Sequence, residues 1–234
     1  MESYTILAKY YDKLMKDFSY SAYLDFIKGY VKGEGVDLAC GTGKMTIALA
    51  KQGCKIIGVD LSQDMLNEAR DNARKSGKNI VFINEDLKKF TAPHKVDFIT
   101  CVCDGFNYIE NLDVINHIAN YLKVGGYLVF DISSEYKLKS VLGNNTFCED
   151  IKDVTYIWSN KLIDNHVDMQ VAFFEQEKGD MYKRIDETHR QYIHNIDEIK
   201  SILDAHFEYN VYDGQTFKDL KDDSLRYLII AKRK

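Results

Sequence analysis

VDLACGTG, at residues 36–43, is the most informative stretch of this chain. Its apolar start over residues 36–39 predicts a short buried strand, and the apolar positions Met45, Ala48 and Leu49 that follow have helical spacing. Glycines between a strand and a helix allow a tight turn and the close approach of a ligand, because a Cβ would obstruct both. The stretch therefore predicts a strand, a ligand-binding turn and a helix.

The same alternation of strand and helix continues along the chain. A helix capped by Ser62 separates the second and third strands, and we expect Gly125-Gly126 to end the helix before the fifth strand. The expected strands are residues 36–39, 55–59, 80–83, 96–102 and 127–132, with two more at 207–212 and 225–231. Because parallel neighbours need crossover connections, this order predicts an α/β fold, a Rossmann-like doubly wound and mainly parallel seven-stranded sheet.

The last third of the chain departs from that alternation. Residues 154–163, 167–176 and 181–193 read as three consecutive strands, which predicts a small antiparallel three-stranded lid. A helix then opens at Asn195, with Glu198 as its capping-box partner. The lid aromatics either enclose a substrate or pack the lid onto the body, and they are Trp158, Phe173, Phe174, Tyr182 and Tyr192.

We expect one domain over residues 1–234. Its core would be residues 30–134 and 194–234, its N-terminal helical cap residues 1–29, and its antiparallel lid insertion residues 135–193.

Composition narrows the function classes. The chain has 234 residues, 45% of them hydrophobic and 29% charged, and a net charge of −5 without a block of Lys or Arg. A nucleic-acid partner is therefore disfavoured, since binding phosphates needs a basic surface. Neither a membrane span nor a secretory signal is recognisable, so we expect a cytoplasmic protein with no membrane partner. The five cysteines predict reduced thiols, and the histidine spacing predicts no metal site.

Three nucleotide ligands compete for the glycine turn. A phosphate-binding P-loop is excluded because Leu38 stands where its first glycine belongs and Met45 where it needs Ser or Thr. A dinucleotide site is weakened because Thr46 replaces the third glycine. S-adenosylmethionine needs mainly hydrogen-bond acceptors, and Asp60 at the end of the second strand can accept from both ribose hydroxyls. NAD binders share that acid, so the carboxylate alone leaves two of the three alternatives open.

Four stretches in order resemble the motifs of the class I S-adenosylmethionine-dependent methyltransferases, over most of the chain. They are VDLACGTG at residues 36–43, GVDLSQDML at 58–66, NEDL at 84–87 and LKVGGYLVF at 122–130. This resemblance implies S-adenosylmethionine as the cofactor and S-adenosylhomocysteine as the product. The lid resembles, less specifically, the sheet that covers the site in glycine N-methyltransferases and sugar N,N-dimethyltransferases.

The resemblance also implies roles for single residues. Asp60 would bind the ribose, with Leu61 and Met65 beside the adenine. Asp86 would accept from the adenine amino group, and the Leu87 amide would face the ring. The complete expected cofactor site is Ala39, Gly41, Gly43, Asp60, Leu61, Met65, Asp86, Leu87 and Asp104.

The loop CDGFNY, residues 103–108, follows the fourth strand, from which this superfamily projects residues toward the reacting methyl group. We therefore expect the loop to form the active-site floor, with Asp104 as a candidate catalytic group. Tyr11 is similar to a tyrosine that covers the cofactor in small-molecule members, although packing an N-terminal helix on the core would explain it equally well. Cys101 and Cys103 are interpreted as strand thiols without a catalytic role.

His189 is the leading candidate for a base or a substrate ligand, because the ordinary pKa of histidine lies near working pH. It would share one face of a strand with Glu187 and Gln191. Either that face meets the active-site cleft, or it is an ordinary solvated face. The predicted catalytic residues are therefore His189, Tyr11 and Asp104.

These observations predict an S-adenosylmethionine-dependent methyltransferase that acts on a small-molecule N or O acceptor. One alternative is an RNA or protein methyltransferase, which would need a basic groove beside Asp104. Another is a non-catalytic S-adenosylmethionine-binding regulator whose methyl face is blocked by lid aromatics. The acceptor and the oligomeric state do not follow from these residues.

Overall fold

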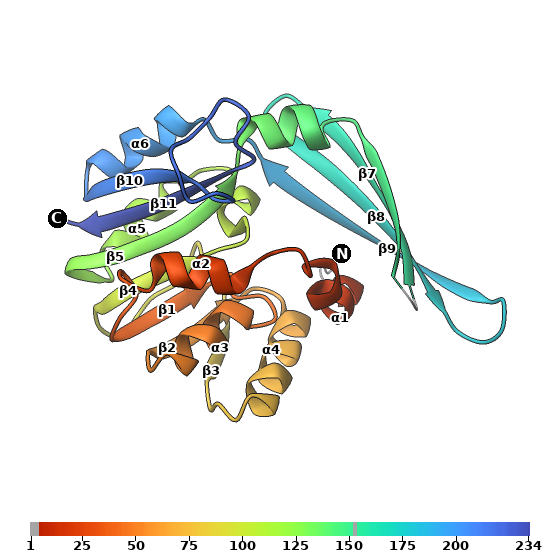
Figure 1. The fold of residues 1–234 in the computed structure, drawn as a ribbon, viewed down its shortest axis with the longest axis horizontal. Helices are drawn as coiled ribbons and strands as arrows, with labels where there is room; N and C mark the ends of the chain where they lie inside the picture. The colour runs from red at the N-terminus through yellow and green to blue at the C-terminus, as the bar shows by residue number, and fades with distance from the viewer. Residues whose placement is uncertain (1–4, 152–153) are drawn as a thin grey trace.

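The computed structural model describes residues 5–151 and 154–234, and it contains two sheets (Figure 1). The larger sheet has seven strands in the order β10-β11-β5-β4-β1-β2-β3. Strands β1 to β5 pair in parallel, whereas β11 is antiparallel to β5 and to β10. The predicted doubly wound fold is confirmed. The strand bounds are β1 Glu34–Leu38, β2 Lys55–Asp60, β3 Val81–Asn84, β4 Val96–Cys101, β5 Leu122–Ser133, β10 Phe207–Asp213 and β11 Arg226–Arg233.

Helices cover both faces of this sheet. Helices α2 (Tyr20–Ile27) and α3 (Lys44–Lys51) share one apolar cluster with Phe98, whereas α5 (Val114–Ala119) and α6 (Ile196–Asp204) pack in the cluster on the other face. Burial of these apolar stripes is what holds helices on a sheet.

Helix α4 (Gln63–Lys75) packs beside β3 and is capped by Ser62, whose hydroxyl accepts from the Met65 amide at 3.2 Å. Asn195 caps α6 in a similar way, because its side-chain oxygen accepts from the amide of Asp197. Ser62 and Asn195 are confirmed as caps, whereas the capping-box contact of Glu198 stays a prediction.

The glycine turn opens at the topological switch point of the sheet. β1 lies between β2 and β4, so the chain builds the sheet outward first on one side and then on the other. In open α/β sheets ligands bind at such a point, beyond the carboxyl ends of the strands. Helix α1 (Thr5–Leu14) lies at this edge, between α4 and the smaller sheet (Figure 1).

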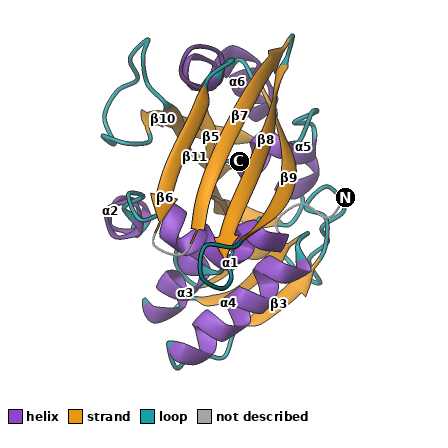
Figure 2. Ribbon diagram, turned by 90° about the vertical axis from the view of Figure 1, so that its right-hand side faces the viewer, coloured by secondary structure: helices purple, strands orange, loops and turns teal. Residues whose placement is uncertain are grey.

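The smaller sheet is an antiparallel lid of four strands in the order β6-β7-β8-β9 (Figure 2). Their bounds are β6 Thr146–Ile151, β7 Val154–Ile163, β8 His166–Gln176 and β9 Tyr182–Tyr192, and a π-helix, η2 (Lys137–Leu142), precedes them. The lid thus has four strands instead of the predicted three, and the strand that was not predicted is β6. This edge strand, TFCEDI, has largely exposed side chains and two acids, so it lacks the apolar alternation that marks a strand.

Gly125-Gly126 does not end a helix, which corrects a second prediction. Helix α5 ends at Ala119, and both glycines lie inside β5. The pairing of β5 with β4 shifts register there: Val96 pairs with Leu122, but Phe98 pairs with Tyr127. A Cβ on Gly126 would lie 2.8 Å from the carbonyl oxygen of Asp97, so glycine permits the close strand approach at this bulge. Among the described residues no helix is long and apolar enough to cross a membrane.

Candidate active site

The two glycines of the turn, Gly41 and Gly43, have different structural roles. Both have positive φ, +53° at Gly41 and +76° at Gly43. A Cβ on Gly43 would lie 3.1 Å from Ala69 Cβ and 3.2 Å from the Phe82 ring, so this glycine lets α4 and β3 pack closely. A Cβ on Gly41 would meet only the Met65 sulfur, at 4.0 Å, and would otherwise fill open space. Gly41 is thus the glycine that leaves room for a ligand.

That open space is a cavity of about 180 Å³, which we call the turn cavity. It contains most of the predicted cofactor residues, namely Ala39, Gly41, Asp60, Leu61, Met65, Asp86 and Leu87. Tyr11 of α1 and Tyr108 of the 3₁₀ helix η1 (Gly105–Tyr108) also line it. Burial keeps the pKa of Tyr11 well above its ordinary value, so its hydroxyl can donate a hydrogen bond but is a poor base.

Asp60 organises this cavity. It ends β2, and its Oδ2 accepts from the Gly41 amide at 2.8 Å while its Oδ1 accepts from the Ser62 amide at 2.8 Å. Burial raises the pKa of Asp60, although these backbone bonds oppose the shift. Each carboxylate oxygen retains a second lone pair, which can accept from a ligand hydroxyl.

A smaller inner cavity adjoins the turn on the side of α2 and includes Asp37 and Tyr20. Asp37 is buried in β1, where it accepts from the hydroxyls of Thr46 at 2.6 Å and Thr100 at 2.7 Å. Burial raises the pKa of Asp37 to about 6, against the opposing effect of those two bonds. The inner cavity therefore contains an acid whose ionised form a nearby cation would stabilise.

Asp104 does not have the position expected of a base or a cofactor ligand. Its carboxylate pairs with Arg226 of β11 at 2.6 Å and with Lys137 at 3.5 Å. Burial opposes ionisation, but Arg226 and Lys137 outweigh it and lower the pKa of Asp104. A carboxylate held this way is a weak proton acceptor. This pairing favours a structural role for Asp104 over the predicted catalytic one.

Sequence reasoning missed the partner that completes this network. Asp131 of β5 is fully buried and accepts from Arg226 at 2.5 Å, from the Tyr23 hydroxyl at 2.7 Å and from the amides of Cys103 and Asp104. Cys103 and Asp104 both have positive φ, 65° and 66°, a conformation that costs energy in residues other than glycine. Asp131 thus holds the loop in shape. The one sequence signal was an acid inside the apolar run 128–132.

Cys103 belongs to this loop and lines the turn cavity, whereas Cys101 is buried in β4. The prediction of a strand thiol is therefore wrong for Cys103. Burial raises the pKa of the Cys103 thiol well above its ordinary value, which keeps it protonated and unreactive.

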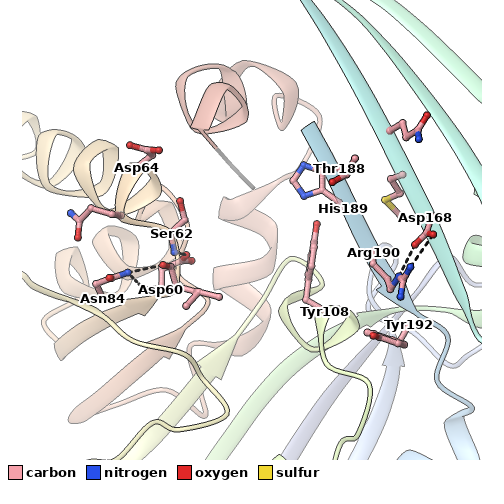
Figure 3. Close-up of a pocket in the computed structure, with 14 residues that line it drawn as sticks. Asp60, Ser62, Asp64, Asn84, Tyr108, Asp168, Thr188, His189, Arg190 and Tyr192 are labelled. Carbon is pink, nitrogen blue, oxygen red and sulfur yellow. Dashed lines mark hydrogen bonds and ion pairs between the residues drawn. The ribbon is translucent and has the colours of Figure 1, made fainter. Parts of the chain in front are cut away.

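A much larger cavity of about 1020 Å³, the outer cavity, lies between the core and the lid (Figure 3). Asp60, Asp64 and Asn84 line it from the core, and lid strands β8 and β9 form the opposite wall. It shares Asp60, Leu61 and Tyr108 with the turn cavity, so the two spaces meet at these residues.

His189 lies in the lid wall of the outer cavity, and Figure 3 shows Tyr108 pointing toward it. Their rings are 6.3 Å apart in a T-shaped arrangement. Glu187, His189 and Gln191 are all buried on one face of β9, which excludes the interpretation of an ordinary solvated face. His189 is 8% exposed, so it is not part of a solvated face.

Two of the five predicted lid aromatics pack the lid onto its surroundings. Phe173 is fully buried with Ile6 and Tyr10 of α1, and Trp158 packs against the same cluster. Tyr182 is 55% exposed, whereas Tyr192 lines the outer cavity. Within the described part of the chain, no group of three or more His, Cys, Asp or Glu side chains is placed to hold a metal ion.

Comparisons with known proteins agree with this geometry. The family model for a methyltransferase domain matches residues 36–126. A methyltransferase-family protein of Geobacillus sp. (strain WCH70) is 32% identical over 214 residues, which cover 86% of this chain and 87% of that protein.

Two solved structures extend the agreement to the whole fold. An S-adenosylmethionine-dependent methyltransferase from Clostridium acetobutylicum ATCC 824 superposes with a TM-score of 0.87 at 34% identity, over 98% of both chains. CalS10 from Micromonospora echinaspora, an amino pentose methyltransferase with S-adenosylmethionine bound, has the same fold, with a TM-score of 0.70 at 14% identity over 95% of this chain and 91% of that one. The present chain belongs to the class I S-adenosylmethionine-dependent methyltransferases and is an enzyme of that class.

Proposed function

We propose that this methyltransferase transfers its methyl group to a nitrogen or oxygen of a small molecule held in the outer cavity. The observation that carries the proposal is the junction of the two cavities at Asp60, Leu61 and Tyr108. A cofactor in the turn cavity would thereby face an acceptor held between core and lid. Largely preformed clefts are typical of sites for small ligands.

The residues of the turn cavity fit S-adenosylmethionine. Asp60 would accept from the ribose hydroxyls, Leu61 and Met65 would flank the adenine, and Asp86 with the Leu87 amide would bind its edge. The open space at Gly41, which a Cβ would fill, supports this assignment. When bound, the cofactor supplies an electrophilic methyl group on a sulfonium.

His189 would accept a proton from the acceptor or hold its nucleophilic atom. Its place in the wall of the outer cavity, beside Tyr108, supports this role. Tyr11 lines both the turn cavity and the inner cavity, so its protonated hydroxyl would orient groups near the reacting methyl. Holding the nucleophile and the methyl group in line supplies much of the rate enhancement in such a displacement.

Electrostatics favours a small acceptor over RNA. The outer cavity includes the carboxylates of Asp60, Asp64 and Asp168, and its Arg190 is already paired with Asp168 at 2.6 Å. Such a lining repels phosphates. CalS10, which shares the fold, is described as an amino pentose methyltransferase.

The test is a screen of small amines and hydroxylated metabolites for release of S-adenosylhomocysteine by the purified protein. With the acceptor so found, His189→Ala should lower kcat by roughly 10²–10⁴-fold, because it removes a general base, and should leave the Kd for S-adenosylmethionine unchanged. His166→Ala, on the neighbouring lid strand, is the matched control and should keep its activity. Full turnover by His189→Ala would overturn its assigned role, and methylation of RNA alone would overturn the acceptor class.

A further inference from the structure

The two carboxylate oxygens of Glu187 contact two different parts of the molecule, helix α1 and His189. Oε1 accepts from the backbone amides of Ile6 at 2.6 Å and Leu7 at 3.3 Å, in the first turn of α1. Oε2 lies 3.4 Å from Nε2 of His189. Both side chains of this pair are 3% exposed, so water screens the contact little.

Glu187 is ionised in this setting. Burial acts to raise its pKa, but the contact with His189 and the hydrogen bonds from the amides of Ile6 and Leu7 outweigh burial and lower the pKa. An anion beside Nε2 favours the tautomer with hydrogen on Nε2. Nδ1 is then the ring nitrogen that can accept a proton.

Helix α1 connects the same carboxylate with the cofactor end of the site. Asp12, near the end of α1, accepts from Thr42 Oγ1 of the glycine turn at 2.7 Å and pairs with Lys44 at 3.2 Å. The helix therefore joins the lid through its first turn and the glycine turn through its last. In Figure 2 it lies across the ends of the lid strands.

We propose that Glu187 is a positioning residue that serves both halves of the reaction: it orients His189 for proton acceptance, and it anchors α1 over the cofactor turn. The first part rests on the function proposed above for His189. Other charged and titratable groups near His189 are Tyr108 on η1 and the paired Asp168 and Arg190 on β8 and β9.

The orienting role is tested by the ring-nitrogen NMR chemical shifts of His189, with the resonances assigned by their loss in His189→Ala. These shifts report which ring nitrogen carries the hydrogen, and in the wild type it should be Nε2. Glu187→Gln keeps the shape of the side chain but replaces a carboxylate oxygen with an amide donor, so it should shift the population toward the tautomer with hydrogen on Nδ1. Glu175→Gln is the matched control, because Glu175 also ties the lid to α1, through Tyr10 at 2.6 Å, and should leave the His189 shifts unchanged. Unchanged His189 shifts in Glu187→Gln would overturn the orienting role.

The anchoring role is tested by hydrogen exchange of the α1 amides and by titration with S-adenosylmethionine. Glu187→Ala should accelerate exchange at Ile6 and Leu7 about tenfold and weaken cofactor binding, because the amides lose their acceptor. Glu187→Gln retains an oxygen and should stay close to the wild type, which separates loss of the anchor from loss of charge. Unaltered exchange and affinity in Glu187→Ala would overturn this role.

Neither readout uses an acceptor substrate. Failure of the proposed function would appear as full turnover by His189→Ala, whereas failure of this inference would appear in the Glu187 variants alone.

Discussion

Asp60 is the residue on which cofactor affinity should depend most. Its carboxylate fixes the Gly41 and Ser62 amides and is proposed to accept from the ribose. Asp60→Ala should weaken S-adenosylmethionine binding by about 1.5–3 kcal/mol, since hydrogen bonds to a charged group are lost. Calorimetric titration measures this, and Asp71→Ala, on the exposed face of α4, is the control. Wild-type affinity in a folded Asp60→Ala protein would contradict the assignment of the ribose site.

Asp37 should make stability depend on pH. Its pKa is raised from 3.8 to about 6, so the native state binds a proton that the unfolded state releases between these values. The free energy of unfolding should therefore fall as pH rises from about 4 to 6.5, by up to about 3 kcal/mol from this group, and then level off.

Asp37→Asn isolates that contribution. Because the neutral amide has no such titration, the variant should gain stability relative to the wild type across the same window. Urea unfolding of both proteins at pH 4.5 and pH 7 measures the difference. A constant difference between the two pH values would contradict the raised pKa.

Among the structural elements, the loop after β4 depends most on distant partners. Arg226 on β11 neutralises Asp104 in the loop and Asp131 on β5, and its side chain is only 11% exposed. Removing one member of a buried ion network leaves the others uncompensated. The loop that lines the turn cavity is therefore held by a strand more than 100 residues away.

Arg226→Met should lower the free energy of unfolding by about 3–5 kcal/mol, measured by urea denaturation. Adding Asp104→Asn should recover part of the loss, because one unpaired charge is removed. Arg184→Met is the control: its pair with Asp186 is exposed on the lid and should contribute less than about 1 kcal/mol. A loss as small as that of the control would show that the network adds little to stability.

At the scale of the whole molecule, the net charge and the lining of the outer cavity both favour a small-molecule acceptor over RNA. The net charge is −5, and carboxylates line the outer cavity. We expect RNA to bind weakly if at all, without the steep salt dependence that counterion release produces. A filter-binding titration at 50 and 200 mM salt tests this. Micromolar binding that collapses with salt would instead favour the alternative of an RNA methyltransferase.

The sequence by itself determined the parts of this protein that depend on neighbouring residues. The 36–43 turn, the caps at Ser62 and Asn195 and the acid ending β2 are local, so spacing and residue type were enough. The same holds for the class of fold, because each strand and crossover helix bears its own apolar pattern. The edge strand β6 was missed because exposed side chains leave no such pattern.

Only the tertiary structure decided what the charged residues do. The sequence makes Asp104 a candidate catalytic group, but the fold places Arg226, 122 positions later, against it. Glu187 read as one polar residue on a strand, but folding brings it to amides 180 and 181 positions earlier. The role of a buried charge is set by the partner that neutralises it, and that partner comes from long-range packing, which local sequence does not encode.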